Sequence, residues 1–223
     1  MKNRNRMLSL LLVLLLALGC AACGSAATRE TAASAPAAQP EETAPEAARQ
    51  EQAPAEPESS LHHVEIVIRD YGTVKLELDA AAAPKTVENF LNLAGRGFYD
   101  GLTFHRIMDG FMIQGGDPSG NGTGGSGKNV TGEFALNGWD NPISHGKGVI
   151  SMARAADYNS ASSQFFICVA DATFLDGQYA AFGRVTEGLE IVEQIAKDAR
   201  PIDNNGTVPA DQQPVIERIT VID

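Results

Sequence analysis

The sequence predicts a mainly β domain, a closed antiparallel β-barrel whose ends are covered by α-helices. Three observations support this fold class: many short segments alternate apolar and polar residues, two longer segments have helical periodicity, and glycine-rich turns separate them. The chain has 223 residues and 43% hydrophobic content, which allows one domain with a substantial core and additional segments outside it.

The domain is predicted to begin near Leu61 with two paired strands. Residues 63–69 (HVEIVIR) and 73–78 (TVKLEL) alternate apolar and polar side chains, as half-buried strands do. Residues 71–72 (YG) lie between them and favour a turn. We therefore expect this segment to form a β-hairpin.

An amphipathic helix is predicted after the hairpin. Pro84 is typical of the first position of a helix, and Gly95 is expected to end it. The apolar face of this helix comprises Val87, Phe90, Leu91 and Ala94.

Shorter strand-like segments follow, together with a second helix. The strand-like segments are 103–107, 111–114, 133–135, 149–153, 165–169 and 180–185, with 214–221 as a closing strand. Residues 187–198 fit the second helix, whose apolar face comprises Leu189, Ile191, Val192 and Ile195.

The N-terminal residues are predicted to lie outside the domain. Residues 1–19 combine three basic residues with the apolar run 7–18, which is typical of a signal peptide. Cys20 follows small residues, and this arrangement resembles a bacterial lipoprotein signal, in which the lipid-bearing cysteine becomes the new N-terminus. Cys23 is the alternative lipidation site. An ordinary secretory signal or an uncleaved anchor is the alternative to lipidation.

Residues 20–60 are predicted to be a disordered tether. The stretch is rich in Ala, Glu and Pro and has no aromatic residue, so it cannot bury enough apolar surface to offset its conformational entropy. Together with the signal, it predicts an extracytoplasmic protein that a lipid anchors to the bacterial cell membrane.

The charge of the chain argues against a nucleic-acid partner, and its cysteine content excludes a disulfide within the domain. The formal net charge is -11 and the pI is about 4.8, whereas phosphate binding needs patches of Lys and Arg, so nucleic acid is not an expected partner. Cys168 is the only cysteine of the predicted domain, so no disulfide can form within it.

Arg106 is the candidate catalytic residue. The segments 104–117 (FHRIMDGFMIQGGD) and 163–168 (SQFFIC) surround it with apolar and amide side chains. A single cation in such surroundings suits a pocket that binds an uncharged, apolar group and polarises it. Hydrolysis would instead require a nucleophile with a base, or a metal.

The motifs FHRI, GFMIQGGD, GVISMAR, SSQFFIC, FLDG and AFGRV occur in this order. They resemble those of the cyclophilins, the cyclosporin-binding family of peptidyl-prolyl cis/trans isomerases, and the resemblance spans about residues 61–223. It implies an eight-stranded barrel capped by two helices.

The resemblance also implies roles for individual residues. The catalytic group is Arg106, Gln114 and Phe166. The proline socket is formed by Phe111, Met112, Phe166 and Leu175, and Gln164 joins Gln114 in positioning the arginine and the substrate backbone. The main chain of Ala153 and Arg154 pairs with the substrate, and Phe174 and Tyr179 lie at the rim.

Two rim residues depart from the family pattern. Phe174 stands where vertebrate members carry Trp, and it lacks the indole N–H that contributes to cyclosporin binding, so only weak cyclosporin binding is expected. Tyr179 stands where many members carry His, and we expect this change to affect substrate preference.

No cofactor and no metal are predicted. His62, His63 and His145 lack the spacing of metal ligands, and His105 is interpreted as a structural residue. The segment 122–129 (GTGGSGKN) is similar to a phosphate-binding loop, but Asn follows its lysine where Ser or Thr is needed.

The predicted function is a peptidyl-prolyl cis/trans isomerase that accelerates rotation about Xaa-Pro bonds of extracytoplasmic proteins and assists their folding. Its expected partners are proline-containing polypeptides and, through the lipid, the membrane; we expect a monomer. The alternative is a non-catalytic chaperone or scaffold module that binds proline-containing peptides. Arg106 favours catalysis, because a module that only binds would not need it.

Overall fold

The computed structural model describes residues 60–223. The predicted signal peptide, both candidate lipidation sites and the predicted tether up to residue 59 lie outside the described residues. Within residues 60–223, no helix combines the length and the apolar character that crossing a membrane requires.

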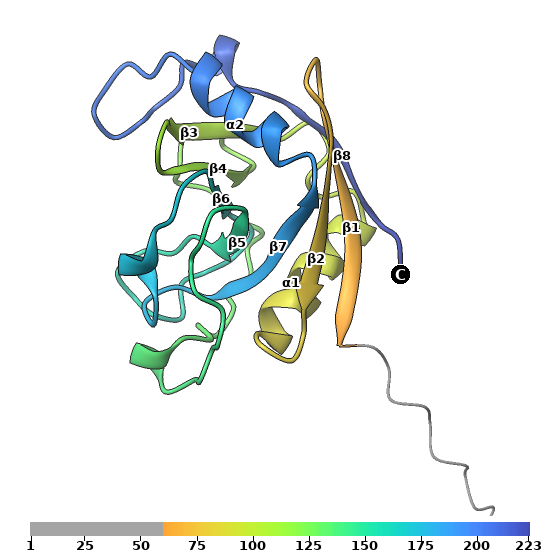
Figure 1. The fold of residues 1–223 in the computed structure, drawn as a ribbon, viewed down its shortest axis with the longest axis vertical. Coiled ribbons are helices and arrows are strands. Elements are labelled where there is room, and N and C mark those ends of the chain that lie inside the picture. Colours follow the sequence, from red (N-terminus) through yellow and green to blue (C-terminus); the bar gives the residue numbers. More distant parts are fainter. Residues whose placement is uncertain (1–59) are drawn as a thin grey trace, which may run out of the picture. The chain divides into compact units, whose positions relative to one another are not determined.

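Eight antiparallel strands form one sheet in the order β3-β4-β6-β5-β7-β2-β1-β8 (Figure 1). In chain order they are β1 (Leu61–Ile68), β2 (Gly72–Asp79), β3 (Thr103–Met108), β4 (Met112–Asp117), β5 (Val149–Met152), β6 (Phe165–Cys168), β7 (Ala181–Glu187) and β8 (Ile216–Val221). The helices are α1 (Pro84–Gly95) and α2 (Leu189–Asp198), with short 3-10 turns at η1 (Ala135–Asn137), η2 (Thr173–Leu175) and η3 (Ala210–Gln212). The eight strands and two helices that the family resemblance implies are therefore confirmed.

The sheet curls into a half-barrel, and the prediction of a closed barrel is wrong. Most of the outer edge of β3 pairs with the segment 206–208 instead of β8: the Ile107 N–H donates to the Gly206 carbonyl at 2.8 Å, and the Val208 N–H donates to the His105 carbonyl at 3.0 Å. Only the start of β3 reaches the segment before β8, through a bridge between Thr103 and Val215. No continuous ladder therefore joins the two edge strands.

The predicted strand at 133–135 is also wrong. This segment instead supplies hydrogen-bond acceptors to the N-terminus of α1. Glu133 is buried, and its carboxylate accepts the backbone N–H groups of Lys85 at 3.0 Å and Thr86 at 2.9 Å. The Thr86 hydroxyl adds a third bond at 2.8 Å. The carboxylate thus satisfies donors that the first turn of a helix leaves unpaired, and the chain then turns into η1.

Helix α1 supplies the centre of the core. It begins at Pro84 and ends at Gly95, as the sequence predicts, but Leu93 is buried on its inner face where Leu91 was expected. The Phe90 ring contacts those of Tyr99, Phe165 and Phe182, with centroids 5.1 to 5.5 Å apart. In Figure 1, α1 lies toward one end of the curled sheet and α2 lies toward the other.

Candidate active site

Strand register places the three candidate catalytic residues side by side. Arg106 on β3 faces Gln114 on β4, and Gln114 faces Phe166 on β6. Directly opposed residues of neighbouring antiparallel strands project to the same face of a sheet. The pairing therefore gathers a cation, an amide and an aromatic ring on one surface.

A second apolar cluster, separate from the main core, lies beside these residues. Its buried members are Met112, Phe166, Cys168, Ala172 and Leu175. Phe165, the neighbour of Phe166, belongs to the main core, so the two adjacent rings point to opposite faces of β6, as strand alternation predicts. This second cluster forms the floor of an apolar socket.

All of the predicted site residues except Gln164 line one cavity of about 310 Å³. Gln164 lines an adjoining cavity of about 230 Å³, and the two cavities share Gln114, Ala153 and Arg154. Phe174 is 65% exposed at the rim, where its ring lies 5.5 Å from that of Phe111. The arrangement is a shallow groove with an apolar floor.

Four contacts hold the Arg106 side chain in this groove. Its Nε donates to the carbonyl oxygen of Asn205 at 2.8 Å, and its Nη1 donates to Oε1 of Gln114 at 3.0 Å. The sulfur atoms of Met108 and Met112 lie 3.3 and 3.8 Å from its terminal nitrogens. Burial lowers the pKa of Arg106 from its usual range, but a guanidinium keeps its charge at physiological pH.

The turn that supplies Asn205 is shaped by Asp203 and Gly206. Oδ1 of Asp203 accepts the Asn205 N–H at 3.0 Å. Gly206 has φ of 86°, and a Cβ atom at this position would lie 2.6 Å from the carbonyl oxygen of Ile107. A larger residue would therefore push the turn away from β3 and displace the acceptor that orients Arg106.

An amide relay connects Gln114 to the glycine-rich loop. Nε2 of Gln114 donates to Oε1 of Gln164 at 3.0 Å. Nε2 of Gln164 then donates to the carbonyl oxygens of Gly122 and Gly124 at 3.1 and 2.8 Å. Because each amide has a fixed partner, Oε1 of Gln114 is held in the orientation that accepts from Arg106.

Asp117, at the end of β4, holds the other side of this loop. Its carboxylate accepts the N–H groups of Ser119 at 2.8 Å, Asn121 at 3.1 Å and Gly122 at 2.6 Å. Burial alone would raise the pKa of Asp117, but these backbone bonds together hold it below its usual range. The loop is therefore attached to the sheet by an ionised carboxylate.

Arg154 lines the groove, and its side chain packs against Tyr179 at the rim. Its guanidinium lies 4.6 Å from the ring centroid of Tyr179 and 5.0 Å from that of Tyr158, and its Nε donates to the Gln178 carbonyl at 3.0 Å. Among the residues described here, its backbone N–H and carbonyl have no hydrogen-bond partner. They are available to an extended peptide, whereas the Ala153 N–H already donates to the Gln164 carbonyl.

A chain of polar contacts behind Phe166, from buried Ser151 and His145 to exposed Asp176, is not predicted by the sequence. Nδ1 of His145 lies 2.8 Å from Oδ1 of Asp176, and Nε2 lies 3.0 Å from the Ser151 hydroxyl. The His145 ring stacks on Phe166 at 6.1 Å between centroids and 14° between planes. Burial lowers the pKa of His145 despite the nearby carboxylate, so a neutral imidazole supports the socket floor. Ser151 and Asp176 belong to the motifs GVISMAR and FLDG, but neither motif includes His145, so the sequence does not indicate that the imidazole joins them.

His105 also lies inside the fold rather than at the groove surface. Burial lowers its pKa, and among the described residues neither ring nitrogen has a hydrogen-bond partner. In residues 60–223, no three His, Cys, Asp or Glu side chains form a group that could hold a metal ion.

Comparison with known proteins places the chain in a family. The family described as cyclophilin type peptidyl-prolyl cis-trans isomerase/CLD matches residues 63–221. The chain belongs to the cyclophilin-type isomerases. It is 46% identical over 126 residues to a peptidyl-prolyl cis-trans isomerase of Helicobacter pylori, covering 56% of this chain and 74% of that protein. It is 44% identical over 130 residues to peptidyl-prolyl cis-trans isomerase B of Bacillus subtilis, covering 58% and 87%.

Solved structures agree with this assignment. A cyclophilin-type peptidyl-prolyl cis-trans isomerase of Cryptosporidium parvum superposes with a TM-score of 0.64 at 31% identity, covering 73% of this chain and 98% of that one. The same protein was solved in the presence of the dipeptide Ala-Pro and superposes with a TM-score of 0.63, covering 72% and 99%. The present chain is therefore a peptidyl-prolyl cis-trans isomerase of the cyclophilin type.

Replacing Phe174 by Trp is expected to strengthen cyclosporin binding to this cyclophilin about three- to tenfold, the value of one added hydrogen bond. The side chain is exposed at the rim, so an indole fits without disturbing the core, and its N–H supplies the donor that phenylalanine lacks. The measurement is inhibition of isomerase activity by cyclosporin. Phe174→Tyr is the control for an added polar group at another position of the ring, and equal inhibition of all three proteins would contradict the prediction.

Proposed function

We propose that the groove around Arg106 catalyses rotation about Xaa-Pro bonds by stabilising the twisted amide. The planar peptide bond is protected by a barrier of about 18–20 kcal/mol, which makes the uncatalysed exchange take tens to hundreds of seconds. In the twisted state the proline nitrogen becomes pyramidal and regains its lone pair. A donor aimed at that nitrogen therefore binds the twisted state more strongly than the planar one, which is the requirement for catalysis.

The observation that carries this proposal is the way Arg106 is held. Two of its five N–H donors are fixed on oxygen acceptors, one on Asn205 and one on Gln114. Its other contacts are weak ones with methionine sulfur, so donors remain for an incoming amide. The guanidinium is thus oriented in advance above an apolar floor, where a hydrogen bond is stronger than in water.

The other site residues have supporting roles in this mechanism. Phe166, Met112 and Leu175 form an apolar socket for the pyrrolidine ring, so burial of that ring supplies binding energy. The unpaired main chain of Arg154 pairs with the substrate backbone and holds one side of the rotating bond. No covalent bond to the substrate is required, and neither a cofactor nor a metal has a step to perform.

Acceleration of protein refolding tests this function on a polypeptide substrate. A protein whose refolding is limited by prolyl isomerisation should refold faster in the presence of catalytic amounts of the isomerase, because the slow step is the one catalysed. The competing function, a module that only binds such chains, predicts the opposite effect. Refolding that slows in proportion to added protein, with no catalytic acceleration, would favour the binding module.

We further propose that the isomerase acts outside the cytoplasm as a lipid-anchored monomer. The proposal rests on the basic and apolar character of residues 1–19, on Cys20 and Cys23, and on the Ala, Glu and Pro-rich stretch that precedes the fold. An anchored domain on such a stretch would reach secreted or surface polypeptides as they fold. Proline-containing segments of those polypeptides are the proposed substrates.

Lipid attachment is predicted at Cys20. Cells that express the chain and are fed a labelled fatty acid should label the wild-type protein and Cys23→Ala, but not Cys20→Ala. If Cys20→Ala keeps its label and Cys23→Ala loses it, the alternative site is the acceptor. If neither change reduces labelling, or if the wild type carries no label, the lipoprotein proposal is wrong and a plain secretory signal or an uncleaved anchor replaces it.

A further inference from the structure

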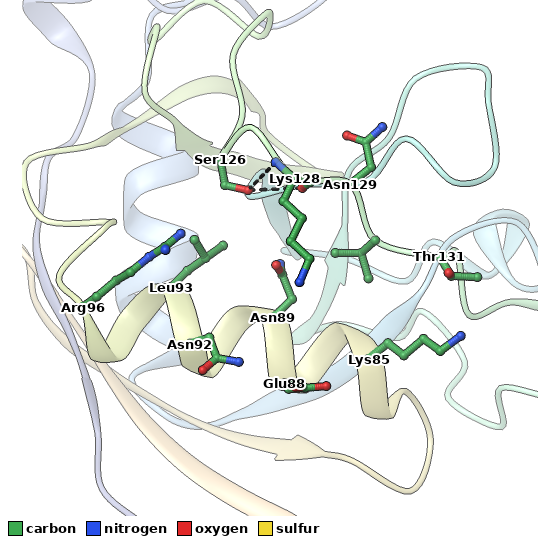
Figure 2. Close-up of a pocket in the computed structure, with 11 residues that line it drawn as sticks. Lys85, Glu88, Asn89, Asn92, Leu93, Arg96, Ser126, Lys128, Asn129 and Thr131 are labelled. Atoms are coloured by element: carbon green, nitrogen blue, oxygen red, sulfur yellow. Dashed lines mark hydrogen bonds between the residues drawn. The ribbon is translucent and has the colours of Figure 1, made fainter.

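A second groove lies between α1 and the segment 126–131, away from the Arg106 pocket. It encloses about 510 Å³, compared with about 310 Å³ around Arg106. Figure 2 shows the side chains that line it, from α1 below and from the loop above. Apart from Leu93 and Val130, the lining is polar or charged.

The groove gathers unpaired positive charge in an acidic protein. Three cations (Lys85, Arg96 and Lys128) and one carboxylate (Glu88) line it, although the chain as a whole carries a formal net charge of -11. Among residues 60–223, none of the three cationic groups has a carboxylate or hydrogen-bond partner, whereas four other basic residues are ion-paired. Cations concentrated in a cleft raise the local concentration of anions.

The cations are spread along the groove instead of converging on one point. Lys85 and Arg96 stand at the two ends of α1, about 16 Å apart at the helical rise per residue. In Figure 2, Lys128 extends from the loop down toward Asn89, Arg96 rises from the far end of the helix, and Lys85 extends away toward Thr131. An extended chain of about five residues spans this distance, whereas one small anion cannot contact all three groups.

The groove adjoins the catalytic surface across Ser162. The Ser162 hydroxyl accepts the Ser126 N–H at 2.9 Å and donates to the Lys128 carbonyl at 2.9 Å, and its own carbonyl accepts from Asn89 at 2.8 Å. Ser162 also lines the cavity that shares three residues with the Arg106 pocket. One hydrogen-bonded serine thus separates the two grooves.

We propose that this groove binds an acidic segment of the same polypeptide whose proline occupies the Arg106 pocket. The proposal rests on the proposed isomerase function and adds a substrate class to it: chains with several Asp or Glu residues flanking the proline. The cations supply charge complementarity, and the neighbouring Asn and Ser side chains supply donors and acceptors for the extended backbone. The remaining acidic surface repels such chains elsewhere, so their binding is directed to this groove.

Binding and turnover of matched peptides test the proposal with the full-length protein. Three kinds of labelled peptide share an Ala-Pro core: one is short, one carries a Glu-rich flank and one carries a Gln-rich flank of equal length. The Glu-rich peptide is expected to bind about tenfold more tightly than the Gln-rich one at low salt, as two or three partly screened ion pairs predict, and the difference should shrink as salt is added. The flank is placed on either side of the proline in separate peptides.

Two double variants with the same change in net charge provide the control. Arg96→Gln with Lys128→Gln should abolish the preference for the Glu-rich peptide. Lys197→Gln with Arg218→Gln removes two exposed cations outside the groove and should keep the preference. Turnover of the short peptide should be unchanged in both variants, because neither touches the Arg106 pocket.

Three other outcomes overturn the proposal, each in a distinct way. Equal binding of the Glu-rich and Gln-rich peptides excludes an acidic segment as the occupant. Equal loss in both double variants shows that only net charge matters. Inorganic phosphate that displaces the Glu-rich peptide far more effectively than chloride at equal ionic strength indicates a small-anion site. If the wild type binds the peptides with the expected preference but isomerises none, the proposed isomerase function fails while the groove assignment stands.

Discussion

Replacing Arg106 by alanine is expected to lower kcat/KM for a short Ala-Pro peptide by about a hundred- to a thousandfold, the loss typical of one preorganised donor to a transition state. The guanidinium is aimed by Asn205 and Gln114 at a position above the apolar floor, and alanine leaves that position without a donor. A protease-free assay of cis-to-trans exchange measures the effect. Peptide affinity should fall much less, because the socket is intact.

Arg106→Lys is the informative companion variant. Lysine keeps the charge but cannot reach both Asn205 and Gln114 with a rigid planar fork, so it should recover only a small part of the lost rate. A lysine variant with nearly full activity would show that charge alone is sufficient. An alanine variant with nearly full activity would remove Arg106 from the catalytic step altogether.

Replacing Glu133 by alanine is expected to lower the free energy of unfolding by about 3 kcal/mol. The substitution leaves the N–H groups of Lys85 and Thr86 and the Thr86 hydroxyl without their acceptor, and Thr86 is buried. Urea unfolding, followed by circular dichroism, measures the change. Because the free energy of unfolding of a domain of this size is only about 5–15 kcal/mol, a loss of this magnitude should be readily measured.

Glu88→Ala is the matched control, since it removes an exposed carboxylate from α1, the helix whose N-terminus Glu133 contacts. We expect it to change the free energy of unfolding by no more than about 0.5 kcal/mol. Equal effects of the two substitutions would mean that the loss of a carboxylate near α1, rather than the capping contact of Glu133, lowers the stability. The isomerase activity of folded Glu133→Ala should be close to that of the wild type, because Glu133 does not line the Arg106 pocket.

Local sequence patterns predicted most elements because their physical basis is local. Alternation placed the hairpin of β1 and β2, and Pro84 and Gly95 marked the ends of α1 where the structure has them. The 133–135 segment was misassigned because a short apolar run does not reveal what its polar neighbour contacts. Glu133 bonds to residues 47 and 48 positions away, which no local pattern encodes.

Barrel closure and the support of the site also depend on distant contacts. The outer edge of β3 is taken by the turn before Val208, so the two edge strands do not pair along their length. The motifs placed Arg106 and Phe166 in one groove, yet the Asn205 carbonyl and the His145 ring that hold them come from segments without a recognisable pattern. The motifs therefore predicted which residues share the groove, including the two glutamines beside Arg106, but not the contacts from Asn205 and His145.

Exchange between the cis and trans forms of an Ala-Pro peptide at equilibrium, measured by NMR with catalytic amounts of protein, tests the central claim most directly. We expect the wild type to bring exchange from tens of seconds or longer to well below a second, and Arg106→Ala to bind the peptide but lose most of this acceleration. A wild-type protein that binds the peptide and leaves exchange at its uncatalysed rate would show that the groove does not catalyse rotation.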